Sequence, residues 1–126
     1  MTKVNLRRVL LVAFGGTIGT AARLGLGLAI PDQGGFPVAV LVANILGAFL
    51  IGVVAARLAA STDLRLLLGT GVLGGFTTYS ALAVQTDALL RGGQAATAFT
   101  YAAGTVALGL AASLAGISLA RRSLAQ

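Results

Sequence analysis

Four long apolar runs, separated only by short polar breaks, limit what this chain can fold into. The runs cover residues 6–30, 36–60, 64–90 and 95–120. Each exceeds the roughly 20 residues that an α-helix needs to cross the hydrocarbon core of a bilayer. The breaks "PDQGG", "STD" and "RGGQ" carry turn and capping residues and are too short to hold a further domain. The sequence therefore predicts an all-α membrane protein with four transmembrane helices in a single domain, residues 1–126.

Composition excludes several functional classes. Only 10% of the 126 residues are charged, against about 25% in a soluble domain, so lipid must face much of the surface. The chain has neither cysteine nor histidine, which excludes thiolate chemistry and removes the commonest general base. The three acidic residues all lie at or near the breaks, which argues against a small four-helix transporter driven by protons. We therefore expect that the chain is not an enzyme, because its sequence offers no nucleophile–base pair and no cluster of metal ligands.

The basic residues gather on one side of the predicted membrane topology. The net charge of +6 could indicate nucleic acid, but the cations are scattered at the ends of the runs, so we expect no nucleic-acid partner. Four spans place both termini and the second break on one side, and that side collects seven of the nine cations: Lys3, Arg7, Arg8, Arg57, Arg65, Arg121 and Arg122. The positive-inside rule then predicts cytoplasmic termini. The first run is longer than the core of a signal peptide, about 7–15 residues, so we expect a retained helix.

Several polar residues lie inside the predicted spans, where each is a candidate for function. Arg23 shares a helix face with two glycines, and it either snorkels to the far interface or attracts anions at a pore mouth. Asn44 lies midway along the second span, where its amide either bonds to another helix or donates to a passing anion. Tyr101 and Thr105 are one turn apart in the fourth span, with the same two interpretations.

The stretch "GVLGGFTTYSAL", residues 71–82, predicts a break in the third span. Gly71 and Gly75 form a GxxxG pattern, which by itself indicates close helix packing. Gly74 and the hydroxyl residues that follow suggest in addition a helix that unwinds near the middle of the membrane. Unwound backbone is tolerated there only when it lines a cavity or is buried in protein. Its freed carbonyl groups can hold a cation such as Na⁺.

Taken together, these motifs resemble those of the small fluoride channels, the Fluc/CrcB family. The segments "GGTIGTAAR" (15–23), "ANILGAFLIG" (43–52) and "GVLGGFTTYS" (71–80) match its pattern in order and spacing, and "YxxxTxxxG" (101–109) resembles its fourth helix. The resemblance implies a fluoride-selective channel of the bacterial inner membrane, which exports fluoride passively from the cytoplasm and protects against fluoride toxicity.

The same resemblance implies an antiparallel dimer, with a structural Na⁺ held at its centre by backbone carbonyl groups of the broken helix. Those carbonyl groups would belong to Gly74 and Thr77. The implied fluoride pathway comprises Arg23, Asn44, Tyr79, Ser80, Leu82, Tyr101 and Thr105.

Three positions depart from the family pattern. Tyr79 and Leu82 stand where the family has phenylalanines, and Val40 stands where it has a threonine. A second interpretation is therefore a non-conducting structural or regulatory subunit. The excess of cations on one side is also unusual for this family. A chain that inserts in both orientations should carry similar numbers of Lys and Arg on the two sides, because an excess on one side fixes the orientation. We accordingly expect either a homodimer or, as the bias favours, a heterodimer with a homologous chain of opposite orientation, surrounded by membrane lipid.

Overall fold

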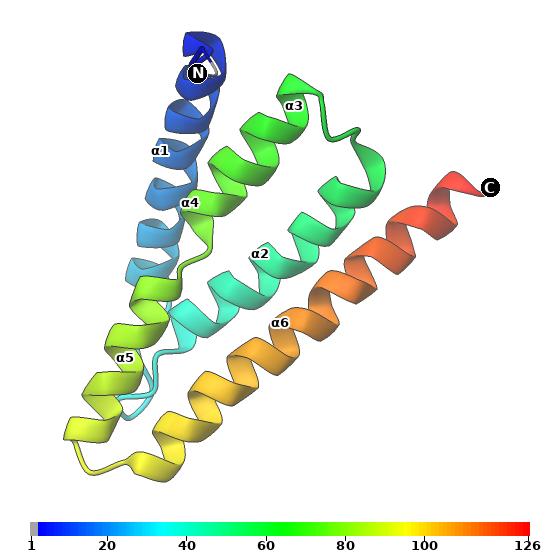
Figure 1. The fold of residues 1–126 in the computed structure, drawn as a ribbon. Coiled ribbons are helices and arrows are strands. Elements are labelled where there is room, and N and C mark those ends of the chain that lie inside the picture. Colours follow the sequence, from blue (N-terminus) through cyan, green and yellow to red (C-terminus); the bar gives the residue numbers. More distant parts are fainter. Residues whose placement is uncertain (1–2) are drawn as a thin grey trace.

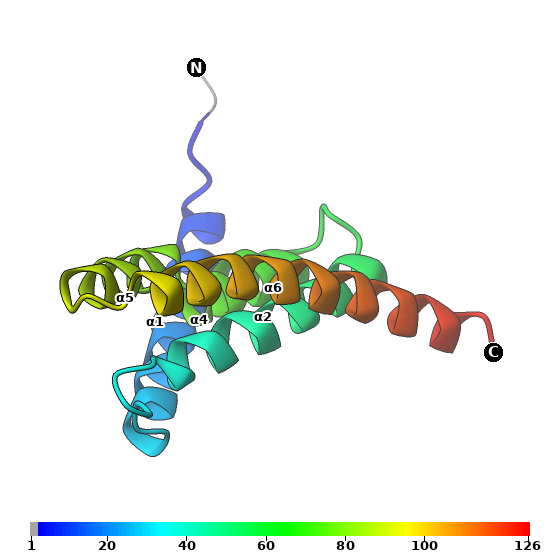
Figure 2. The same cartoon turned by 90° about the horizontal axis from the view of Figure 1, so that it is seen from below.

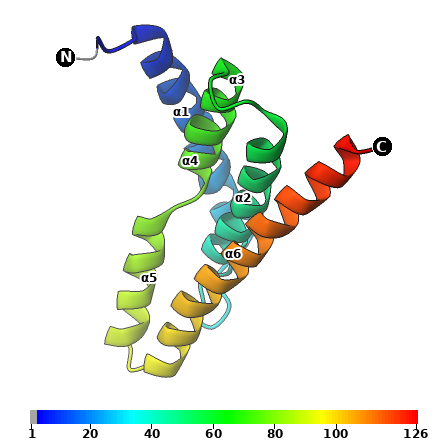
Figure 3. The same cartoon turned by 45° about the vertical axis from the view of Figure 1, so that its right-hand side comes forward.

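Four helical spans of 24, 20, 29 and 30 residues run from one end of the molecule to the other, which confirms the predicted all-α membrane architecture (Figure 1). The computed structural model describes residues 3–126. The first, second and fourth spans are the helices α1 (Leu6–Ala29), α2 (Val38–Arg57) and α6 (Ala95–Leu124). The N-terminal end, the loop 58–62 and the C-terminus lie at one end of the molecule, and both other connections lie at the opposite end (Figures 1 and 3).

The third span is bent, as predicted, and contains four elements. It begins with α3 (Asp63–Arg65), continues as the π-helix η1 (Leu66–Leu73) and the short α4 (Gly74–Phe76), and resumes after a break as α5 (Tyr79–Arg91). The break contains fewer residues than the stretch of glycines and hydroxyl residues indicated. Its two extended residues are Thr77, with ψ of 153°, and Thr78, with ψ of 122°. The wider π-helical winding of η1 was not predicted from the sequence.

Local side chains explain where these helices start. The Asn5 side chain accepts a hydrogen bond from the Arg7 backbone N–H at 3.1 Å and caps α1. The Thr62 hydroxyl accepts the backbone N–H of Arg65 at 3.3 Å and caps α3. The Thr78 hydroxyl accepts an N–H of α5 in the same way. These caps provide acceptors for amide groups that have no partner inside their own helix.

The connection between α1 and α2 is a tight hairpin. Gln33 and Phe36 exchange two backbone hydrogen bonds, of 3.1 and 2.9 Å. Gly34 and Gly35 form the turn with φ of 59° and 84°, a conformation that side chains disfavour. The hairpin places the Phe36 ring against the helical bundle.

Helix α1 packs against η1 and α4 through backbone contacts at glycines. A Cβ atom added at Gly15 would come within 2.6 Å of the Leu67 carbonyl oxygen, and one added at Gly19 would overlap the Val72 carbonyl group. On the other side of the contact, Gly75 has no space for a Cβ beside the Gly16 backbone. Glycines therefore permit the close helix approach that membrane proteins use in place of hydrophobic burial.

Helix α5 packs against α6 through side chains. Leu82, Leu89, Ala98 and Tyr101 form a buried cluster, and Phe36 from the hairpin packs against it. Figures 1 and 3 show that the two helices meet at the turn 92–94 and diverge toward the other end of the molecule. Figure 2, seen from below, shows α1 crossing the other spans rather than running along them.

Large apolar side chains cover the outside of the spans. Phe14, Leu28 and Phe99 are 64%, 82% and 76% exposed. In the most apolar window of each span, no more than 22% of the residues are buried inside the chain. Lipid or another protein chain must therefore cover these faces, because exposing large apolar side chains to water is unfavourable.

Candidate functional site

The Asn44 side chain binds both backbone polar groups of Thr78 at the break. Its Oδ1 accepts the Thr78 N–H at 2.8 Å, and its Nδ2 donates to the Thr78 carbonyl oxygen at 3.1 Å. These bonds replace the helical partners that the extended backbone has lost. The amide therefore makes the interhelical bond that was one of the two interpretations for Asn44. An asparagine amide has two N–H groups, so one remains for another acceptor.

Arg23 lies on the opposite side of the break and turns toward the protein. Its Nε donates to the Gly75 carbonyl oxygen at 3.2 Å, and the Thr20 hydroxyl lies 3.5 Å from the same oxygen. Gly75 belongs to the last turn of α4, whose carbonyl groups carry partial negative charge. The half-buried guanidinium therefore stabilises the end of this helical segment.

The break leaves two backbone carbonyl oxygens available as ligands. In a continuous helix the Thr78 N–H would donate to Gly74, but here it donates to Asn44. Within residues 3–126, neither the Gly74 nor the Thr77 carbonyl oxygen accepts a hydrogen bond. Both are the uncharged oxygen donors that hard cations prefer.

A cavity of about 300 Å³ adjoins the break, between α2, α5 and α6. Four of the predicted fluoride-pathway residues line it: Asn44, Tyr79, Leu82 and Thr105. The predicted cation ligand Thr77 lines it too, and so does Thr78. The structure thus brings an amide, three threonines and a tyrosine from three helices to one cavity, whose remaining lining is small or aliphatic.

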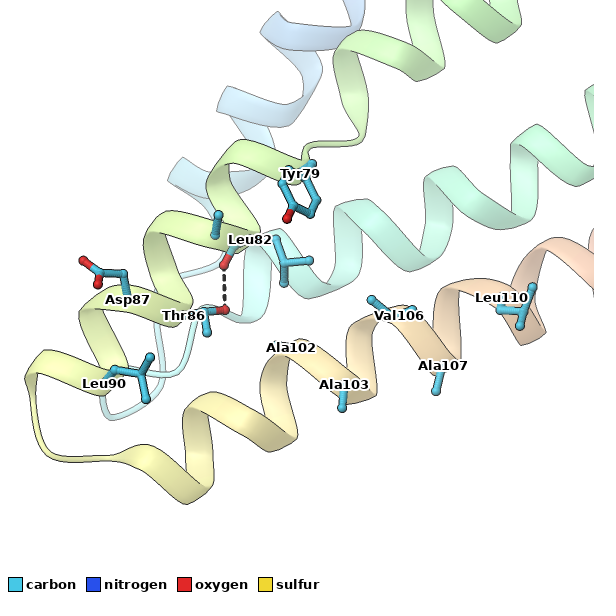
Figure 4. Close-up of a pocket in the computed structure, with 11 residues that line it drawn as sticks. Tyr79, Leu82, Thr86, Asp87, Leu90, Ala102, Ala103, Val106, Ala107 and Leu110 are labelled. Carbon is cyan, nitrogen blue, oxygen red and sulfur yellow. Dashed lines mark hydrogen bonds between the residues drawn. The ribbon is translucent and has the colours of Figure 1, made fainter.

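A second, more apolar groove of about 750 Å³ lies between α5 and α6 (Figure 4). Tyr79 and Leu82 border both spaces. Tyr79 is 83% exposed, whereas Leu82 is only 9% exposed and belongs to the side-chain cluster. In Figure 4 the Thr86 hydroxyl points to the Leu82 carbonyl oxygen, to which it donates at 2.7 Å. Leu82 therefore lies where the cavity adjoins the apolar groove, together with Tyr79, Val106 and Leu110.

Three other predicted pathway residues lie outside the cavity. Ser80 is exposed, with its hydroxyl 3.1 Å from that of Thr78. Tyr101 is 1% exposed, and its ring packs edge-on against Phe36 with the ring centres 5.5 Å apart. Within the described residues the Tyr101 hydroxyl has no hydrogen-bond partner. Arg23, the third, is on the α1 side of the break, at Gly75.

Two residues of the site were missed from the sequence. Thr78 provides both backbone partners of Asn44, and its hydroxyl accepts the Ala81 N–H at 3.1 Å. A threonine at the start of a helical run is an N-cap signal and could have indicated where α5 begins. Thr20 contacts the Gly75 carbonyl oxygen across helices, and no local pattern predicts such a contact.

Comparisons with known proteins identify relatives of this chain. The family model described as "CrcB-like protein, Camphor Resistance (CrcB)" matches residues 10–117. A relative from Leifsonia xyli, named "Fluoride-specific ion channel FluC 2", is 48% identical over 120 residues, which cover 90% of this chain and 83% of the relative. Relatives named "Fluoride-specific ion channel FluC" include one from Chlorobaculum tepidum, 47% identical over 92% of this chain and 96% of its own length. Another, from Thermus thermophilus, is 44% identical over 90% of this chain and 95% of its own length.

Proposed function

The chain belongs to the CrcB-like family, and we propose that it is a subunit of a fluoride-selective ion channel that lets fluoride leave the cytoplasm passively and so protects against fluoride toxicity. The relatives' names describe ion channels, which agrees with the expectation that the chain is not an enzyme. We place it in the bacterial inner membrane with both termini in the cytoplasm. The charge bias of the sequence supports that orientation.

The observation that carries the proposal is the set of polar groups that line the cavity beside the break. Fluoride is a small, strongly hydrated anion, so a pore must replace its water with hydrogen-bond donors. The second N–H of Asn44 and the hydroxyl groups of Thr78 and Thr105 can provide them. The Thr105 hydroxyl donates to the Tyr101 carbonyl oxygen at 2.6 Å, so it must turn to reach an anion. The edge of the Tyr79 ring is electropositive and can also face an anion.

We propose that the Gly74 and Thr77 carbonyl oxygens hold a structural Na⁺ at the centre of the dimer. The residues fit such an ion, because both oxygens are free of hydrogen bonds in the described chain. Two copies would present a set of uncharged oxygens of the kind that binds Na⁺ at broken helices. A bound Na⁺ would supply positive charge beside the carbonyl ends of α4, and Asn44 would keep the Gly74 oxygen free for it.

We further propose that the working unit is an antiparallel dimer. The large exposed side chains on α5, such as Tyr79 and Val84, need a cover of lipid or protein. The excess of cations at the end with both termini favours a single orientation, so the partner would be a homologous chain of opposite orientation. A homodimer of two oppositely inserted copies is the other arrangement. Tags at both termini, probed for sidedness in cells, distinguish the two, since a homodimer requires both orientations of this chain.

Fluoride efflux from liposomes tests the proposed function. The chain is reconstituted alone and together with a homologous chain of opposite charge bias, and fluoride release is followed with an ion-selective electrode. We expect fluoride flux well above chloride flux in at least one of the two preparations. Absence of fluoride flux in both would contradict the channel proposal.

One observation favours a second candidate, a non-conducting subunit. Leu82 places an aliphatic side chain at the cavity wall, and Val40 packs against the same cluster without a hydroxyl group. Such a chain would stabilise a partner whose own residues conduct. In that case the mixed preparation conducts, and Asn44→Ala in this chain leaves fluoride flux unchanged.

A further inference from the structure

A groove of about 260 Å³ lies between α2 and η1 and meets the cavity beside the break at Ile51. Arg65 lies where η1 begins, close to the loop 58–62. Ala55 and Val54, near the end of α2, lie level with Arg65, whereas Ile51, Gly69 and Thr70 lie about one helical turn deeper. The groove therefore has a cationic end near the membrane surface and a mostly apolar wall below it. Its lining residues are Ile51, Val54, Ala55, Arg65, Gly69 and Thr70.

The π-helical winding of η1 brings Arg65 and Thr70 to the same groove. Its i→i+5 hydrogen bonds, such as Gly74 N–H to Gly69 carbonyl oxygen, bring residues four and five apart to the same side of the helix. In an α-helix the same two residues would point to different faces. The threonines at 17, 77, 86 and 105 each donate to the carbonyl group four residues earlier. The Thr70 hydroxyl makes no hydrogen bond within the described chain.

Arg65 is held at the groove with most of its donors free. Its Nη1 donates to the Leu58 carbonyl oxygen at 3.0 Å, which fixes the guanidinium beside the C-terminus of α2. Within residues 3–126 its other side-chain N–H groups make no hydrogen bond. A guanidinium presents five N–H groups in a planar fork suited to two phosphate oxygens at once.

The charge around the groove favours an anion. Asp63 is the single acidic residue at this end, and its carboxylate pairs with Arg7 at 2.5 Å. Arg57 is directed away, because its guanidinium donates to the Ser123 hydroxyl on α6. Arg65 is therefore the cation that the fold leaves at the groove.

We propose that this groove is a binding site for an anionic phospholipid. The phosphate binds the Arg65 guanidinium, and a glycerol or ester oxygen accepts a hydrogen bond from the Thr70 hydroxyl. The first methylene groups of an acyl chain cover Ile51 and Val54. Along the groove the cation Arg65 comes first and apolar side chains come after it, as the charged headgroup precedes the acyl chain in a phospholipid. Basic pockets between membrane helices bind anionic headgroups in this manner. The proposal does not depend on fluoride conduction.

Lipid retention in native mass spectrometry tests the site. The protein is delipidated in neutral detergent and offered equal amounts of phosphatidylglycerol and phosphatidylcholine with identical acyl chains. We expect one retained phosphatidylglycerol, with a preference of about tenfold, the size expected for a charge-assisted contact to guanidinium. Equal retention of both lipids by the wild-type protein overturns the proposal.

Two pairs of variants locate the lipid. Gly69→Leu fills the groove, where an added Cβ would meet only Val54 at 3.7 Å, and its control Gly25→Leu points into open space. Arg65→Gln removes the groove cation, and Arg121→Gln removes a cation elsewhere at the same end. We expect the first member of each pair to lose the preference and the control to keep it. Unchanged preference in Gly69→Leu overturns the site.

Inorganic phosphate distinguishes a lipid from a free anion. Added alone to the delipidated protein, it should neither be retained nor raise the melting temperature. A phosphate adduct that depends on Arg65 would instead show a site for free anions and overturn the lipid proposal.

Discussion

Residues 63–76 and residues 79–91 belong to the same span, yet different kinds of contact hold them in place. The first part packs its backbone against α1 at Gly15, Gly19 and Gly75, where no Cβ atom fits. The second part packs through side chains, with Leu82 and Leu89 buried against α6 while Tyr79 remains exposed.

These two kinds of contact divide the span into a supporting region, residues 63–76, and a variable region, residues 79–91. Close backbone contacts tolerate no added atom, so the first part positions the break and its free carbonyl groups. Side-chain contacts beside a cavity accept replacement more readily, because neighbouring volume can accommodate the change. Of the three positions expected to depart from the family pattern, Tyr79 and Leu82 lie in the second part, and Val40 on α2 packs against the cluster that contains Leu82. The cavity lining can therefore change while the scaffold remains.

The largest effect is expected from Gly19→Ala in the supporting region. The new methyl group would overlap the Val72 carbonyl group, and backbone cannot move aside as a side chain can. We expect a loss of about 3 kcal/mol or more in stability. The melting temperature in detergent measures it. Gly25→Ala is the matched control on the same helix, since a Cβ there meets nothing within 4 Å. Equal melting temperatures for the two variants would disprove the backbone contact.

Asn44→Ala tests the connection between the two regions. It leaves the Thr78 N–H and carbonyl group without their partners, at a cost of about 1–3 kcal/mol. We expect fluoride flux in liposomes to fall about tenfold or more. Asn5→Ala removes an asparagine cap from α1 and should lower stability without changing flux. Intact flux with Asn44 removed would reduce its role to packing.

Leu82→Phe tests the variable region by introducing the aromatic ring that the family resemblance implies at this position. Two adjoining spaces leave room for the larger side chain. We expect fluoride flux relative to chloride to rise about threefold, the size of an aromatic edge contact. Leu89→Phe makes the same change in the same cluster, away from the cavity beside the break. If both variants raised the ratio equally, the ring would act through packing rather than at the pore.

Arg23→Gln should give the smallest effect. It removes one bond to the Gly75 carbonyl oxygen and a positive charge beside the break. We expect fluoride flux to fall about twofold at low ionic strength and less at high ionic strength, because salt screens partly exposed charges. Arg91→Gln is the control, since that cation pairs with Asp87 on the surface. A reduction that does not depend on salt would assign Arg23 a purely structural role.

Much of the architecture could be predicted because hydropathy and capping act locally. The four spans end within a few residues of their predicted limits, and the third is bent as expected. The π-helix was not predicted, because its winding depends on how residues 66–73 meet α1 and α2. Within the predicted stretch, residues 74–80, the extended backbone is confined to Thr77 and Thr78, where Asn44 supplies the hydrogen bonds that it needs.

The sequence by itself determined a four-span membrane protein, its excess of cations at one end and the polar residues that must find partners within it. Only the tertiary structure decided which partners they find. Asn44 bonds to Thr78, 34 residues away, and Arg23 bonds to Gly75, 52 residues away. The physical reason is that apolar length and charge act through the bilayer on each segment separately. A hydrogen bond between segments depends on how closely the glycines let their helices approach.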